Sequence, residues 1–296
     1  MLRDAAVDVL CDASLAEVVD LVAYADGDSI IVANVDGAAR LSRLDPGAPA
    51  EVIRGRDPVA WQDPLAFSSL VDELADPSPP NARNSYPWAG ERLTSLFAAA
   101  AAPDIAVVHT GRHFWPERGG HPGEHGSLNV VQSRAPLILS GPSVTARGLL
   151  PVAARVPDVA PTLAWLAGAS LADLGDMEGH ALVDFLVPHP GPVVGLLWDG
   201  CNSNSLYSMA AAGELPTVAR LLDRGCAFAG GAIAEFPSVT LVNHTCALTG
   251  VGPGRHGIVN NAYYDRSAGE QRLTNDARTW HRWSEWLAPG IRTAFD

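Results

Sequence analysis

The 296-residue sequence contains no lysine, and arginine supplies all of its long basic side chains. This excludes a Walker-type phosphate loop, in which a lysine contacts the phosphates. Acidic residues outnumber basic ones by 33 to 20, so the formal net charge is −13. A charge of this sign argues against a surface for nucleic acid or for an anionic membrane, and we expect neither partner.

Cysteine is scarce, and long apolar runs are missing. The four cysteines are widely separated and match neither a metal-binding nor a disulfide spacing, so we expect buried free thiols. No apolar run reaches the length of a membrane span, and the first residues are too acidic for a secretory leader. These features favour a cytoplasmic protein without a membrane segment. The length allows one large or two modest domains.

The hydropathy pattern indicates an α/β protein. Apolar runs of strand length alternate with helix-like segments, which predicts a mostly parallel sheet covered by helices on both faces. Asp36-Gly37 is a turn pair typical of a tight hairpin. Three tryptophans at three-residue spacing near the C-terminus indicate one packed side of a helix. The expected helices are 15–23, 88–102, 216–222 and 241–249, and the expected strands are 29–33, 38–44, 193–198 and one that begins at Ile105.

Asp199 follows the apolar run 193–198, which reads as a buried strand. Ligands gather at the carboxyl ends of strands in open α/β sheets, so Asp199 lies where a metal ligand would lie. An Asp-Gly pair is also common in turns, and that reading remains the alternative.

Thr240 directly precedes a helix-like stretch that Gly250 closes. A hydroxyl at a helix N-terminus faces unpaired N–H groups and the positive end of the helix dipole. These groups favour an anion such as phosphate and lower the cost of a developing alkoxide. Thr240 could equally serve as the N-cap, and the two readings are compatible.

The spacing of several residues in this second part resembles the type I phosphodiesterase and nucleotide pyrophosphatase family of the alkaline phosphatase superfamily. The resemblance implies a threonine nucleophile at Thr240, a zinc ligand at Asp199 and an amide donor to a phosphoryl oxygen at Asn261. Asn260 is adjacent, and which of the two asparagines points inward stays open. The resemblance gives His244, His256 and Asn243 structural roles. The matching positions are Asp199-Gly200, Phe236-Pro237, Thr240, Asn243-His244, Thr249-Gly250, Pro253, His256-Gly257-Ile258 and Asn260-Asn261.

The first part of the chain resembles the carboxyl-terminal portion of the same superfamily. In that portion a histidine of a Gly-x-His-Gly segment binds zinc, which nominates His125; His109, His113 and His121 are nearby alternatives. The matching segments are 105–108, 123–126, 136–142 and 158–162.

The two regions, 1–190 and 191–296, thus occur in swapped order. Such an order fits a circular permutation, a slice through tandem copies or a truncated frame.

The resemblance implies a metal-dependent hydrolase that acts on a small phosphoester and uses two divalent ions, which we expect to be zinc. The sequence lacks the Asp-His pair that such a site needs, so the ligand set is incomplete. Asp176 and His180 match an Asp-x-x-x-His spacing, which we interpret as coincidence, with a substitute ligand pair as the other reading.

Two other functions stay open. The first is another enzyme of the superfamily, such as a phosphomonoesterase, a sulfatase or a phosphonate hydrolase, although a threonine argues against sulfatase. The second is a catalytically incomplete remnant or binding module. The sequence carries no signal for an oligomeric state.

Overall fold

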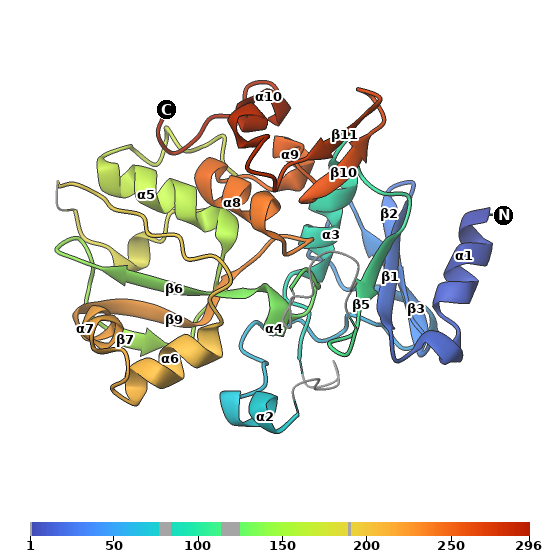
Figure 1. Cartoon of the computed structure of the whole chain (residues 1–296), viewed down its shortest axis with the longest axis horizontal. Coiled ribbons are helices and arrows are strands. Elements are labelled where there is room, and N and C mark those ends of the chain that lie inside the picture. Colours follow the sequence, from blue (N-terminus) through green and yellow to red (C-terminus); the bar gives the residue numbers. More distant parts are fainter. Residues whose placement is uncertain (1, 77–83, 114–124, 189–190) are drawn as a thin grey trace.

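The computed structural model describes residues 2–76, 84–113, 125–188 and 191–296 (Figure 1). Its strands form a larger sheet, a smaller sheet and a two-stranded ribbon, and helices lie around them. The helices are α1 (Leu2–Leu10), α2 (Leu70–Ala75), α3 (Ala89–Ala98), α4 (Val130–Ser133), α5 (Val159–Ala167), α6 (Ser203–Ala211), α7 (Pro216–Arg224), α8 (Thr240–Thr249), α9 (Pro253–His256) and α10 (Trp283–Trp286). The strands are β1 (Val19–Asp26), β2 (Ser29–Ala33), β3 (Gly37–Ser42), β4 (Glu51–Gly55), β5 (Ala106–His109), β6 (Arg134–Ser140), β7 (Gly148–Leu150), β8 (Ala154–Arg155), β9 (Gly225–Ile233), β10 (Ala262–Asp265) and β11 (Glu270–Leu273).

The larger sheet has the order β4-β3-β2-β1-β5, and each of its pairs is antiparallel. The predicted hairpin is confirmed: β2 and β3 pair from Ala33 opposite Ala38. The side chain of Asn34 closes the turn, because its Oδ1 accepts from the N–H groups of Asp36 and Gly37. The expected helix over 15–23 is wrong. This stretch is rich in β-branched valine and enters β1, where both faces are packed.

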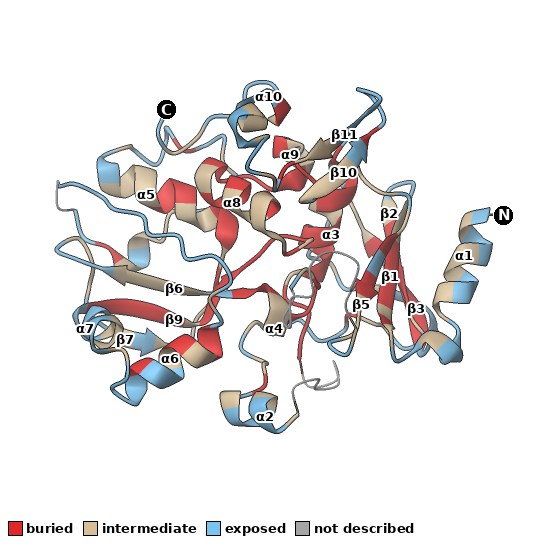
Figure 2. Cartoon of the chain, in the orientation of Figure 1, coloured by how far each residue is buried: buried red, intermediate tan, exposed pale blue. Residues whose placement is uncertain are grey.

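Alternate residues of β1 and β2 point to opposite faces of this sheet. Leu21 and Ile30 pack against α3 in the largest apolar cluster, whereas Val22 and Ala33 pack against α1 on the other face. Figure 2 shows the buried band that these strands form. The larger sheet and α3 thereby form the main apolar core of the first region.

The smaller sheet is built around β9. Strand β6 pairs with it antiparallel, while β7 and β8 pair with it parallel. In Figure 1, α5 and α8 lie on one side of this sheet and α6 and α7 on the other. The expected helices on both faces are therefore present here. The chain is a mixed α/β protein, but the expectation of mostly parallel strands is wrong, because six of the eight described strand pairs are antiparallel.

The central strand of the smaller sheet comes from a different region than its neighbours. Strand β9 belongs to residues 191–296, and β6, β7 and β8 belong to residues 1–190. Backbone hydrogen bonds of one sheet thus join the two sequence regions.

The expected buried strand over 193–198 is wrong. The segment has no strand structure, and Val194 and Leu196 are 87% and 88% exposed. An apolar run is buried as a strand only where a neighbouring strand pairs with it, and the described part of the chain places none beside this run. No helix among the described residues is long and apolar enough to cross a membrane.

The expectation of free thiols is confirmed, since all four cysteines are free; Cys226 and Cys246 are buried, and Cys11 and Cys201 are half-buried. The tryptophan prediction holds only in part. Trp286 is buried at α10, whereas Trp280 is 56% exposed.

Candidate functional site

Thr240 is the first residue of α8, after an extended residue, Val239, which takes the N-cap position. The helix ends at Gly250, whose φ of 70° closes it in the left-handed region, as the sequence predicts. Thr240 is therefore not the N-cap residue. Its half-buried side chain lies at the helix end where the first N–H groups have no partner within the helix.

The segment before Thr240 is joined to the first sequence region. The Nδ1 atom of His125 lies 2.6 Å from the carbonyl oxygen of Ser238. A carbonyl can only accept, so Nδ1 carries the hydrogen, and the neutral ring presents its lone pair on Nε2. The hydroxyl of Ser238 in turn donates to the carbonyl of Ser127, at 2.8 Å. Ser238 lies two residues before Thr240, so this bond holds His125 close to the start of α8. In the sequence, His125 and Ser238 are 113 positions apart.

His109 and His113, two of the alternatives to His125, lie next to each other. The rings of His109 and His113 lie 5.1 Å apart in an edge-to-face pair. His121, together with Gly123 and Glu124 of the predicted Gly-x-His-Gly segment, lies outside the described residues.

Asp199 lies on an exposed turn with Gly200, rather than at the end of a buried strand. Burial lowers the pKa of His244, and the nearby charge of Asp199 opposes this shift. His244 follows Thr240 by four residues, one helical turn along α8. The carboxylate therefore lies close to the first turns of the helix that begins with Thr240.

Asn261 contacts the same helix end. Its Oδ1 accepts from the backbone N–H of Leu241 at 2.9 Å, so its amide occupies one of the first N–H groups of α8. Asn260 accepts from the N–H of Asn261 and is exposed. Of the two asparagines, Asn261 is the one whose side chain bonds to the helix that begins with Thr240, although Asn260 is the one that lines the groove described next.

One groove joins these residues. Its volume is about 2670 Å³, and Thr240, Asp199 and His125 all line it, together with the exposed run 193–198 and parts of β5 and β6. A site for a small ligand usually has about 300–1,000 Å³. The groove is larger because it includes the open space beside the unpaired run. The contacts of Ser238 and His244 place the three side chains around the start of α8 within it.

These residues do not complete a metal centre. A catalytic zinc ion takes about three protein ligands. Within the described ranges, no three His, Cys, Asp or Glu side chains are close enough together to hold a metal ion. Asp199, Thr240 and His125 therefore fall short of the two-ion site that the sequence resemblance implies, and we derive no chemical step through a metal.

Asp176 and His180 do not replace the missing ligands. Residues 176–180 form no helix, so the two side chains share no helix face. The carboxylate of Asp176 is exposed and pairs with Arg292 at 3.5 Å, and the N–H of His180 donates to Asp158. The interpretation of their spacing as coincidence agrees with these contacts.

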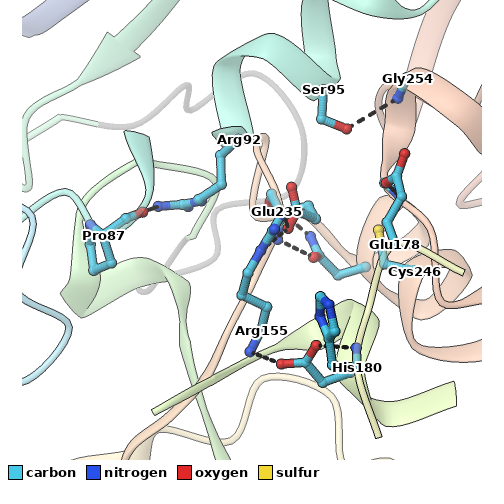
Figure 3. A network of polar contacts seen from close by, with 12 residues as sticks. Pro87, Arg92, Ser95, Arg155, Glu178, His180, Glu235, Cys246 and Gly254 are labelled. Carbon is cyan, nitrogen blue, oxygen red and sulfur yellow. Dashed lines mark hydrogen bonds and ion pairs between the residues drawn. The ribbon is translucent and has the colours of Figure 1, made fainter. Parts of the chain in front are cut away.

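A buried polar network lies around Glu235 and Cys246, next to the helix α8 (Figure 3). No pattern in the sequence indicated it. Glu235 is fully buried, and its Oε1 accepts from Nε of Arg155 at 3.0 Å. His256 is also fully buried, and its Nε2 lies 3.3 Å from Sγ of Cys246. Burial raises the pKa of the Cys246 thiol well above its usual range, so this cysteine stays protonated and unreactive.

Residues 193–294 match the family model described as type I phosphodiesterase / nucleotide pyrophosphatase. The chain is also similar to alkaline phosphatase PafA of Elizabethkingia meningoseptica, with 32% identity over 108 residues. This alignment covers 36% of the chain and 19% of the relative's length. No solved structure matches the chain.

Both matches agree with the resemblance seen in the residues around Thr240. The family model describes phosphodiesterases and nucleotide pyrophosphatases, and the relative is named an alkaline phosphatase. Residues 193–294 are thus similar to the type I phosphodiesterase / nucleotide pyrophosphatase family.

Proposed function

We propose that this chain is a phosphoester hydrolase in which Thr240 is the nucleophile. The observation that carries the proposal is the position of Thr240 as the first residue of α8, beside a groove that Asp199 and His125 also line. A helix N-terminus attracts a phosphate group through its free N–H groups and its dipole. The family match over 193–294 supports the same reaction class.

In the proposed reaction, Oγ1 of Thr240 loses its proton to solvent and attacks phosphorus, and the ester oxygen departs with its electron pair and takes up a proton. Thr240 is then esterified to the phosphoryl group, which keeps its second ester group when the substrate is a diester. Water attacks the same phosphorus, Oγ1 departs with its electron pair, and Oγ1 takes up the proton that the water loses. The N–H groups at the start of α8 other than that of Leu241, which is bonded to Asn261 Oδ1, and the Nδ2 donor of Asn261 stabilise the charge on the phosphoryl oxygens in this proposal. Asp199 and Nε2 of His125 are the donors that this chain offers to a divalent ion, and we expect zinc to need further donors for tight binding.

The substrate class we propose is a small phosphodiester or nucleotide pyrophosphate. A phosphomonoester is the second candidate, since the relative at 32% identity is an alkaline phosphatase. Parallel assays with bis-p-nitrophenyl phosphate and p-nitrophenyl phosphate, each with added zinc, separate the two. If wild-type protein hydrolyses neither ester, the hydrolase proposal is wrong and the incomplete remnant is the better description.

The nucleophile is tested with Thr240→Ala. We expect kcat/KM to fall about 1000-fold or more, because no other group can form the covalent ester. Thr145→Ala is the matched control, since Thr145 lies outside the groove and its hydroxyl makes no hydrogen bond within the described residues. Mass spectrometry after an acid quench should find the transferred group on the peptide that contains Thr240, which is phosphate from the monoester and p-nitrophenylphosphate from the diester. Equal rates for Thr240→Ala and wild type would contradict the assignment.

A further inference from the structure

We propose that Asn243 is a positioning residue, whose side chain holds residues 235–239 so that Thr240 is correctly placed in the groove. The kinetic consequence of this inference rests on the proposed function; the structural consequence does not. Asn243 was expected to have only a structural role, and its contacts define what that role is.

The Asn243 side chain bonds to both ends of the segment that leads into α8. Its Oδ1 accepts from the N–H of Glu235 at 2.7 Å. Its Nδ2 faces the carbonyl oxygens of Glu235, Pro237 and Val239, each at 3.2 Å. One amide therefore serves four backbone groups in five consecutive residues, and the last of these residues is bonded directly to Thr240.

The place of Asn243 in the helix makes this contact set available. Side chains of an α-helix tilt toward its N-terminus, so a residue in the first turn reaches back over the entering chain. The backbone N–H of Asn243 also donates to the carbonyl of Val239, which begins the helical ladder. An aspartate has acceptors only, so at this position it would face three carbonyl oxygens without a hydrogen to share.

The other support of the segment comes from the first sequence region. The carbonyl and the hydroxyl of Ser238 bond to His125 and Ser127. The segment 235–239 is thus held from one side by Asn243 and from the other by residues 125–127. Removal of the Asn243 bonds leaves Ser238 and the Glu235–Arg155 pair as side-chain anchors of the segment, and its last residues before α8 can then shift. A displacement of about 1 Å at a reacting group can lower a rate about 100-fold.

The test compares Asn243→Asp and Asn243→Ala with wild type. The aspartate keeps the acceptor for Glu235 and removes the three donor contacts; the alanine removes all four and suits a helix, so it covers the case in which the aspartate variant fails to fold. Asn34→Asp is the matched control, because Asn34 uses only its acceptor Oδ1, in the turn between β2 and β3.

Hydrogen exchange gives the readout that is independent of activity. We expect backbone amides of 235–240 to exchange at least about 10-fold faster in both Asn243 variants, while β1 and β9 keep wild-type exchange. In the steady-state assay we expect kcat to fall about 10- to 100-fold and KM to change less than about 3-fold, since the substrate still finds the groove.

Unchanged exchange over 235–240 would overturn the inference, as would faster exchange with an unaltered kcat in an active enzyme. An inactive wild-type protein would refute the proposed hydrolase alone. In that case local loss of protection in the Asn243 variants still supports the positioning role, and unchanged protection still overturns it.

Discussion

The titration of a single histidine should be visible in the stability of the whole protein. His256 is fully buried, and burial lowers its pKa to about 3. In the unfolded chain its pKa is near 6.5. Between these two values the unfolded state binds one more proton than the folded state, so the free energy of unfolding decreases as the pH falls.

We expect His256→Asn to remove this part of the pH dependence. The asparagine oxygen can replace Nδ1 as acceptor for the N–H of Ile258 and does not titrate. Urea unfolding of wild type at pH 7 and pH 5 should differ by about 2 kcal/mol more than the same difference in the variant. If both proteins lose equal stability between pH 7 and pH 5, His256 is not the group responsible.

The closeness of residues near the start of α8 could be predicted from the sequence, and their roles stay predictions. Thr240 and Asn261 follow from fixed spacings close in sequence, and the structure places both at one helix end. The bond of His125 to Ser238 spans 113 positions, and the Arg155 bond to Glu235 spans 80. No local pattern encodes such contacts, because they depend on how the two regions pack.

At the scale of elements, one ion pair connects β8 with the segment between β9 and α8. The fully buried carboxylate of Glu235 bonds to Arg155, and no described residue bonds its second oxygen. Arg92 of α3 is fully buried nearby, and burial lowers its pKa to about 10 while the charge of Glu235 raises it. Glu235 therefore offsets positive charge that the first region brings into the core.

Removal of one partner should cost more than removal of both. We expect Arg155→Met to lower the free energy of unfolding by about 3–5 kcal/mol, since it leaves the Glu235 carboxylate without its bonded partner. The double variant Arg155→Met with Glu235→Leu should recover part of that loss. A double-mutant cycle from urea unfolding measures the coupling. Additive effects of the two substitutions would show that the pair does not act as a unit.

The prediction of helices and strands succeeded where nearby residues in the sequence determine the structure. It failed where pairing with other strands determines it. The hairpin of β2 and β3 and the closure of α8 at Gly250 follow from turn residues in the sequence. The residues that enter β1 were expected to form a helix and form a strand, whereas 193–198 was expected to form a strand and has no strand structure. Strand β1 is a strand because other strands lie on both sides, and 193–198 is not one because none does.

At the scale of the whole molecule, the two regions are joined by strand pairing and helix packing as well as by the chain between them. Strand β9 has partners from the first region on both edges, and α8 packs next to α5. We expect residues 1–190 and 191–296, produced separately, to show no cooperative thermal transition, because each lacks strands that the smaller sheet requires. The intact chain should show one. Calorimetry of the three proteins checks this, and a cooperative transition in either isolated region would contradict it.

The exposed run 193–198 makes a protease digest informative. Every side chain from 191 to 200 is accessible, so an enzyme that cuts after leucine or tryptophan should cleave there first. The two products should leave a sizing column together and separate only in denaturant, since β9 lies beyond the cut and remains between β6 and β7. Cleavage would then cut the chain where the two regions meet in the sequence, and the regions would stay associated.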